Sequence, residues 1–150
     1  MYTIAFDTTA AGCSVALTQD ERVLGRYVEQ MDFGQAEVLI PAIQNLLNEH
    51  NLQMTDLGLL TVCVGPGSFT GVRSSISAAR AFGLACPELT VGGVSAFDAY
   101  AYSLSWTPDQ IAALNAVIIE TKREDFYFQI FDEHLNKLTE PEAANREDII

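Results

Sequence analysis

The sequence predicts an α/β protein whose first part is an antiparallel meander and whose later part alternates strands with helices. Three short β-type runs, residues 3–6, 13–18 and 23–29, are separated by turn-prone residues. Beyond them, apolar strand-like runs alternate with segments in which apolar residues recur at helical spacing. A third observation is a weak internal repeat between residues 4–8 and residues 117–121. In both segments a predicted strand ends with an acidic residue followed by threonine, and a hairpin comes next. These patterns indicate a sheet covered by helices, in a duplicated two-lobed fold.

The first helix is expected over residues 35–49. Leu39, Ile43 and Leu46 fall at helical spacing, and further apolar residues widen the stripe beyond one face. Pro41 lies inside this pattern and must either sit in the first turn or kink the helix, because it has no N–H donor. The broad apolar stripe predicts that this helix contacts more than one neighbour.

The middle of the chain reads as strand, glycine loop and helix. An apolar strand over residues 59–64 runs into Gly65-Pro66-Gly67-Ser68-Phe69-Thr70-Gly71-Val72-Arg73, and a helix rich in small residues is expected over residues 74–85. Further predicted elements are strands at 90–94 and 112–119, a helix at 96–104, and a second hairpin that uses residues 126–131. We therefore expect a complete first lobe over residues 1–108 and the start of a second, truncated lobe over residues 109–150.

Composition and charge narrow the possible functions. The chain has 150 residues, 49% of them hydrophobic, which is enough for an ordinary globular core. Its formal net charge of -12 should repel phosphate backbones, so direct binding of transfer RNA is not expected. The three cysteines are interpreted as reduced core residues, and neither a signal segment nor a membrane-spanning run is present in the sequence. These features predict a soluble cytoplasmic protein.

The glycine loop and the end of the first strand carry the candidate ligand contacts. Backbone N–H groups at a helix start after such a loop favour an anion, although the Gly-Lys-Ser/Thr ending of a Walker loop is absent and a structural turn is the commoner interpretation. Asp7 and Thr8 are placed like the first phosphate loop of the sugar kinase, chaperone and actin superfold, but an Asp before a turn is also common in hairpins. The candidate nucleotide contacts are Asp7, Thr8, Gly65, Gly67 and Ser68.

Arg73 is the unexpected residue of this region. A cation in the first turn of a helix opposes the helix dipole, so a partner carboxylate, a phosphate or a nearby acidic side chain is implied unless the side chain is simply solvated. The small residues after it would allow close approach, and we expect an outside contact in addition to packing within the domain.

His50 and His134 lie far apart in polar segments, so no metal site is expected. Ser68 is not in a Gly-x-Ser-x-Gly elbow, which argues against a serine hydrolase.

The blocks Ile4-Ala5-Phe6-Asp7-Thr8-Thr9, Cys13-Ser14-Val15-Ala16-Leu17 and Gly65 to Arg73 closely resemble the bacterial TsaB family, also called YeaZ. The resemblance covers essentially the whole chain, and the glycine loop makes it specific. It implies an actin-like ATPase fold of the ribonuclease H-like type without independent catalysis. It further implies an obligate partner of the related subunit TsaD, which with the ATPase TsaE modifies adenosine 37 of tRNAs that read codons beginning with A.

The same resemblance implies where partners bind. The family's dimer contact is formed largely by the first two long helices, and it maps onto Leu39, Ile43, Leu47, Val72, Arg73, Ile76, Ala79 and Gly83. A homodimer is expected when TsaD is absent, tRNA is expected to bind only through the complex, and no cofactor of its own is expected. Whether ATP or ADP lies at the junction with TsaD is left open. The family's usual His-Ser-Gln-like triplet is replaced by Gln35-Ala36-Glu37, so details of this surface are expected to differ.

Two other functions are kept as alternatives. One is an enzyme that binds and hydrolyses ATP with Asp7 and the glycine loop, which would need a second lobe to close over the nucleotide. The other is a peptidase, a label attached to relatives of this family, which requires an activated nucleophile that the sequence does not display. The prediction is a non-catalytic partner subunit.

Overall fold

The computed structural model describes residues 1–121 and 125–145, and the chain forms two compact units. The first unit comprises Met1–Val64 and Ser68–Val94, and the second comprises Gly65–Gly67 and the chain from Ser95 onward. Residues 95–108 thus belong to the second compact unit, and the lobe boundary expected after residue 108 stays a prediction. Among the described residues, no helix is both long and apolar enough to cross a membrane.

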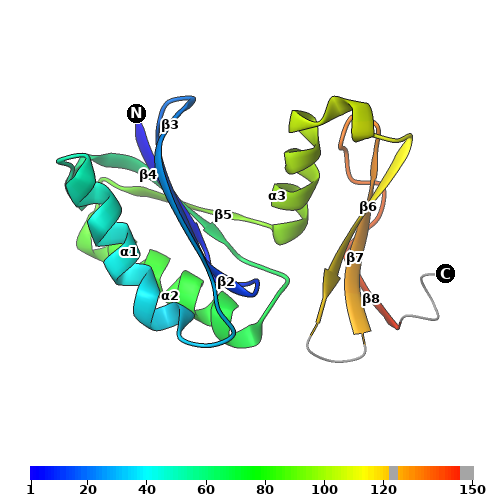
Figure 1. Cartoon of the computed structure of the whole chain (residues 1–150), viewed down its shortest axis with the longest axis horizontal. Helices are drawn as coiled ribbons and strands as arrows, with labels where there is room; N and C mark the ends of the chain where they lie inside the picture. Colours follow the sequence, from blue (N-terminus) through cyan, green and yellow to red (C-terminus); the bar gives the residue numbers. More distant parts are fainter. Residues whose placement is uncertain (122–124, 146–150) are drawn as a thin grey trace. The chain divides into compact units, whose positions relative to one another are not determined.

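A five-stranded sheet forms the centre of the first unit (Figure 1). In order across the sheet, its strands are β3 (Arg22–Gln30), β2 (Gly12–Gln19), β1 (Tyr2–Asp7), β4 (Leu57–Cys63) and β5 (Thr90–Val94). β1, β2 and β3 form an antiparallel meander, whereas β4 runs parallel to both β1 and β5. The predicted meander and the α/β alternation are therefore confirmed.

Two long helices, α1 (Gln35–Glu49) and α2 (Phe69–Ala85), cover the same face of this sheet (Figure 1). α1 has the predicted bounds, and Pro41 lies within it beyond the first turn. α2 begins five residues before the predicted start, because Ser68 caps it and its Oγ accepts the Gly71 N–H at 3.4 Å. Arg73 therefore lies in the second turn of α2, where the dipole opposes a cation less than in the first turn.

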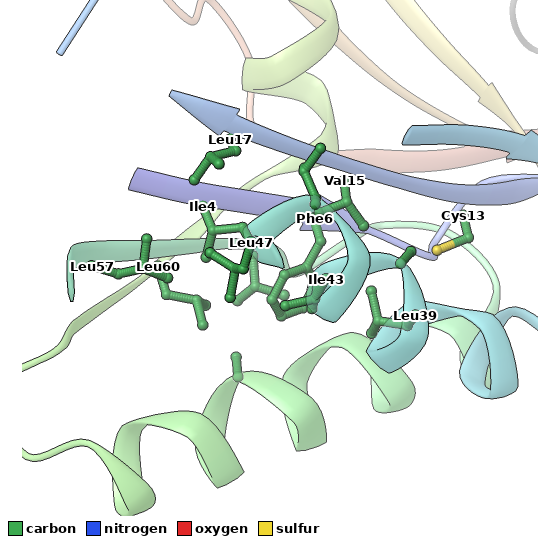
Figure 2. Close-up of a cluster of buried hydrophobic side chains, with 14 of the residues drawn as sticks. Ile4, Phe6, Cys13, Val15, Leu17, Leu39, Ile43, Leu47, Leu57 and Leu60 are labelled. Atoms are coloured by element: carbon green, nitrogen blue, oxygen red, sulfur yellow. The ribbon is translucent and has the colours of Figure 1, made fainter. Parts of the chain in front are cut away.

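The core of the first unit lies between the sheet and these two helices. Ile4 and Phe6 of β1 pair with Leu17 and Val15 of β2, so these side chains share one face of the sheet. Figure 2 shows that face meeting the inner side of α1, from which the side chains Leu39, Ile43 and Leu47 project. Burial of these apolar residues supplies the main stabilisation of the unit.

Among its described residues, the second unit contains a smaller sheet and one α-helix. Its elements are α3 (Ala96–Ser103), β6 (Leu114–Glu120), β7 (Asp125–Asp132) and β8 (Glu142–Asn145), and short 3-10 turns lie at Leu104–Trp106 and Pro108–Gln110. The strands pair antiparallel in the order β6-β7-β8, as β1-β2-β3 do in the first unit. The predicted internal repeat is confirmed. β8 was not predicted, because its sequence Glu-Ala-Ala-Asn carries no β-branched or aromatic residue.

Candidate binding surface on helices α1 and α2

The loop after β1 is held to the first turns of α2 by buried hydrogen bonds. The Thr8 hydroxyl donates to the Gly71 carbonyl at 2.8 Å and lies 2.7 Å from Ser75 Oγ. The Thr8 N–H also donates to Ser75 Oγ, at 3.1 Å. Both Thr8 and Ser75 are 0% exposed. Thr8 is therefore placed inside the protein, where its hydroxyl joins β1 to α2.

The neighbouring donors of this loop also have acceptors within the chain. The Thr9 N–H donates to Asp7 Oδ1 at 2.6 Å, and the Gly12 N–H donates to the Ala10 carbonyl at 2.9 Å. The Ser68 N–H at the start of α2 donates to the Thr9 carbonyl at 2.8 Å. These are the kind of backbone groups that a phosphate would need. In this structure they bind the chain itself.

The expected nucleotide contacts divide between the two compact units. Asp7, Thr8 and Ser68 lie together in the first unit, whereas Gly65 and Gly67 belong to the second. Gly65 has a φ of 93°, which a residue with a side chain rarely adopts, and its carbonyl accepts the Ala96 N–H at 2.8 Å. The glycine loop therefore includes a turn that requires glycine at its first position. A nucleotide contact by these five residues stays a prediction.

A groove with a volume of about 410 Å³ lies between α1 and α2. Its apolar lining includes Leu39 and Ile40 of α1 and Phe69 of α2, and Arg73 and Ser77 lie along it. Phe69 is 75% exposed and Ile40 is 36% exposed. An apolar groove with an exposed aromatic side chain is a feature typical of a binding surface.

The eight residues expected at a partner interface differ in their accessibility. Leu39, Ile43, Leu47 and Ala79 are buried in the core, so their side chains hold α1 and α2 against the sheet. Val72, Ile76 and Gly83 are half-buried and Arg73 is exposed. The use of these helices as an interface stays a prediction. The side chains that contact a partner there must lie on the outer surface of the helices, since the buried ones cannot reach it.

Sequence reasoning missed Ile40, Phe69 and Ser75 as functional or supporting residues. Ile40 was counted within the broad apolar stripe of the first helix, and only the sheet position shows that it points away from the core. Phe69 was assigned to a loop, where an exposed aromatic is less informative than on a helix. Ser75 was interpreted as one of several small residues. Its position four residues after Gly71 puts its hydroxyl on the face that meets the β1 loop.

The Arg73 side chain lies over an aromatic ring of its own helix. Its guanidinium carbon lies 5.2 Å from the centre of the Phe69 ring, one helical turn earlier. The contact with the ring holds the guanidinium beside the groove. The ring face is not a hydrogen-bond acceptor for the N–H groups that lie in the guanidinium plane. The sequence implied a carboxylate of a partner, a phosphate or a nearby acidic side chain for Arg73. Among the described residues Arg73 forms no ion pair with an acidic side chain, and its aromatic neighbour is the Phe69 ring.

The Cys13 thiol is not activated. Burial, followed by the charges of Asp7 and Glu29, raises the pKa of Cys13 from the ordinary 9.0 to about 11. A nucleophilic cysteine needs the opposite shift. In residues 1–121 and 125–145, no three His, Cys, Asp or Glu side chains are gathered so that they could hold a metal ion.

We expect iodoacetamide at about pH 8 to modify Cys86, which is half-buried, well before Cys13, which is 1% exposed and protonated at that pH. The raised pKa means that the folded state holds the Cys13 proton more tightly than the unfolded state. This contribution to stability is present below about pH 9 and is lost as the pH rises through about 11. Peptide mass spectrometry measures the labelling, and equal labelling of both thiols in folded protein would contradict the burial.

Comparison with known proteins places this arrangement in a family. The model of the family described as "TsaD: tRNA N6-adenosine threonylcarbamoyltransferase" matches residues 34–148. The tRNA threonylcarbamoyladenosine biosynthesis protein TsaB of Escherichia coli is 37% identical over 63% of this chain and 40% of its own length. The TsaB protein of Haemophilus influenzae is 29% identical over 94% of this chain and 65% of its own length. The chain thus spans about half the length of the curated relatives it matches.

Solved structures agree on the fold. A Pseudomonas aeruginosa protein described as similar to peptidase YeaZ superposes with a TM-score of 0.84, at 24% identity, over 99% of this chain and 68% of that one. The activator of 2-hydroxyisocaproyl-CoA dehydratase from Clostridium difficile, solved with bound ADPNP, superposes with a TM-score of 0.58, at 13% identity, over 97% of this chain and 46% of that one. Both likenesses place the chain in the actin-like ATPase fold. The chain belongs to the TsaB (YeaZ) family, and the family model that it matches is described as TsaD, tRNA N6-adenosine threonylcarbamoyltransferase.

Proposed function

We propose that the chain is a non-catalytic subunit in tRNA threonylcarbamoyladenosine biosynthesis, and that it binds and activates a TsaD homologue through α1 and α2. The observation that carries this proposal is the apolar groove between these helices, with Phe69 exposed beside it. An apolar groove of this kind suits a helix of a partner protein. The names of the relatives supply the pathway, and TsaE and tRNA would join through TsaD.

The proposal of a non-catalytic role is supported by the loop after β1. Asp7 Oδ1 accepts the Thr9 N–H, and the Thr8 hydroxyl is bonded to Gly71 and Ser75. A loop that binds phosphate by its own N–H groups would have to release these bonds first. A nucleotide at the junction with TsaD would then be held chiefly by TsaD.

Mixing the chain with the TsaD homologue of the same organism is expected to give a one-to-one complex in size-exclusion chromatography with light scattering. Ile40→Glu should weaken this complex at least about tenfold, because a carboxylate in an apolar groove loses its hydration without gaining a partner. Val28→Glu is the matched control, since Val28 lies on β3 and is 65% exposed. That variant should bind like wild type.

Two results would count against this proposal. One is a folded wild-type chain that forms no complex with TsaD at micromolar concentration. The other is saturable ATP binding by the isolated chain that disappears in Asp7→Asn, which would favour the ATP-hydrolysing alternative. Equal weakening by Ile40→Glu and Val28→Glu would place the interface elsewhere on the chain.

A further inference from the structure

Helix α2 has a charge opposite to that of the chain as a whole. The chain carries 20 acidic and 8 basic residues, yet α2 contains Arg73, Arg80 and no acidic residue. The two arginines are seven residues apart, which is two helical turns, so they lie on one stripe about 10 Å apart along the axis. Both are exposed. α2 therefore presents a short cationic stripe on an acidic protein.

This stripe adjoins the groove, and no acidic side chain of the described residues forms an ion pair with it. The ion pairs within residues 1–121 and 125–145 are those of Met1 with Asp20, His134 with Glu133 and Lys137 with Asp98. Arg73 lines the groove, and the groove lining contributed by α1 is apolar. Exposed Leu84, at 85%, extends the same outer surface of α2 beyond Arg80. The surface thus combines apolar contact sites with two guanidinium groups that have no carboxylate partner among the described residues.

We infer that this surface accepts a helix of a different protein, one that places apolar side chains in the groove and carries two carboxylates about two turns apart opposite Arg73 and Arg80. The inference rests on the proposed function in that it uses the same surface. A guanidinium binds a carboxylate through two parallel hydrogen bonds, so each pair would fix the register of the partner helix. The acidic character of the partner is therefore part of its recognition.

The same arginines disfavour pairing of α2 with α2 of a second copy. In a two-fold contact every pairing occurs twice: if residue i of one copy meets residue j of the other, residue j of the first copy meets residue i of the second. An axis near the midpoint of this stripe brings Arg73 of one copy against Arg80 of the other, twice. Like charges opposed across an interface select against the wrong partner. The charge pattern thus favours the heterologous complex over the homodimer.

The net charge of the chain does not cancel this preference. At physiological ionic strength the screening length is about 8 Å, so acidic residues elsewhere repel an acidic partner only weakly. Direct contacts with Arg73 and Arg80 are screened less. RNA phosphates would also be attracted to two arginines, but stable binding to a phosphate backbone takes many such contacts, and the adjoining groove is apolar.

The test compares Arg73→Gln/Arg80→Gln with Arg22→Gln/Arg26→Gln, which removes the same charge from exposed positions on β3. Three equilibria are measured at about 0.05 M and about 0.5 M salt. They are self-association by analytical ultracentrifugation, binding to the TsaD homologue, and binding to a synthetic amphipathic helix with a leucine stripe and two glutamates seven residues apart. The same peptide with glutamines serves as its control.

Removing the α2 arginines should strengthen self-association about tenfold and weaken binding to TsaD and to the acidic peptide about tenfold. High salt should shift wild type in the same directions, and the β3 variant should change little. Equal effects of the two variants, equal binding of the two peptides, or a change of the same sign in self-association and partner binding would overturn the inference. Binding of tRNA to wild type and to the two variants is measured separately. A measurable affinity that is lost only in the α2 variant would replace the acidic helix with RNA.

The two proposals fail in different ways. If no variant binds TsaD while the acidic peptide still binds wild type in preference to the glutamine peptide, TsaD is the wrong partner and the recognition chemistry stands. If TsaD binds all variants equally, the proposed function stands and the arginine stripe has no part in it.

Discussion

Gly71→Ala is expected to lower the free energy of unfolding by more than about 4 kcal/mol, enough to leave little folded protein. A Cβ at this position would lie 1.8 Å from the Thr8 carbonyl oxygen and 2.8 Å from the Thr8 carbonyl carbon. Both atoms are backbone, so they cannot move aside as a flexible side chain would. α2 would have to move away from β1, and the hydrogen bonds from Thr8 to Gly71 and Ser75 would break.

Urea unfolding followed by circular dichroism measures this effect, and Gly92→Ala is the matched control. Gly92 lies in β5 and no heavy atom is within 4 Å of a Cβ built there. That substitution should be neutral or stabilising by up to about 1 kcal/mol, because alanine restricts the unfolded chain. Gly71→Ala protein as stable as wild type would mean that α2 does not lie against the β1 loop as described.

Much of the fold could be predicted because each element has a local signal. The meander showed as β-type runs between turns, and α1 was placed at residues 35–49 from helical spacing alone. The start of α2 was missed because Gly71 lowers helix propensity, while its close packing on Thr8 is a long-range contact. The strand β8 forms by backbone hydrogen bonding to β7. Its four residues have low β propensity, so the sequence gives no local signal for this strand.

The candidate site was harder to predict because its chemistry depends on which way side chains face. The family resemblance implied Leu39 and Ile43 as interface residues, whereas both side chains are buried in the core. Their burial, and the exposure of Ile40 beside them, follow from the position of the sheet beneath α1. Arg73 was singled out as a cation in the first turn of its helix, whereas it lies in the second turn of α2. Its aromatic neighbour Phe69 became apparent only once both residues were placed on one helix.

Thr8→Val is expected to destabilise the protein by about 2–3 kcal/mol. Valine keeps the shape of the side chain but removes the hydroxyl that donates to the Gly71 carbonyl and lies 2.7 Å from Ser75 Oγ. Because Thr8 and Ser75 are 0% exposed, water cannot replace the lost bonds without opening the core. Thr90→Val, at an exposed position on β5, should change stability by less than about 0.5 kcal/mol.

A double-mutant cycle with Ser75→Ala separates a shared network from two independent contributions. The two hydroxyls bond to each other, so the double variant should lose about 1–2 kcal/mol less than the sum of the single losses. Additive losses would mean that the hydroxyls act separately.

A different pattern is expected if Thr8 contacts a nucleotide: Thr8→Val would then weaken ATP or ADP binding and leave the unfolding midpoint almost unchanged. The inward hydrogen bonds of Thr8 favour the first pattern, in which a position that resembles a phosphate contact holds the first strand to helix α2.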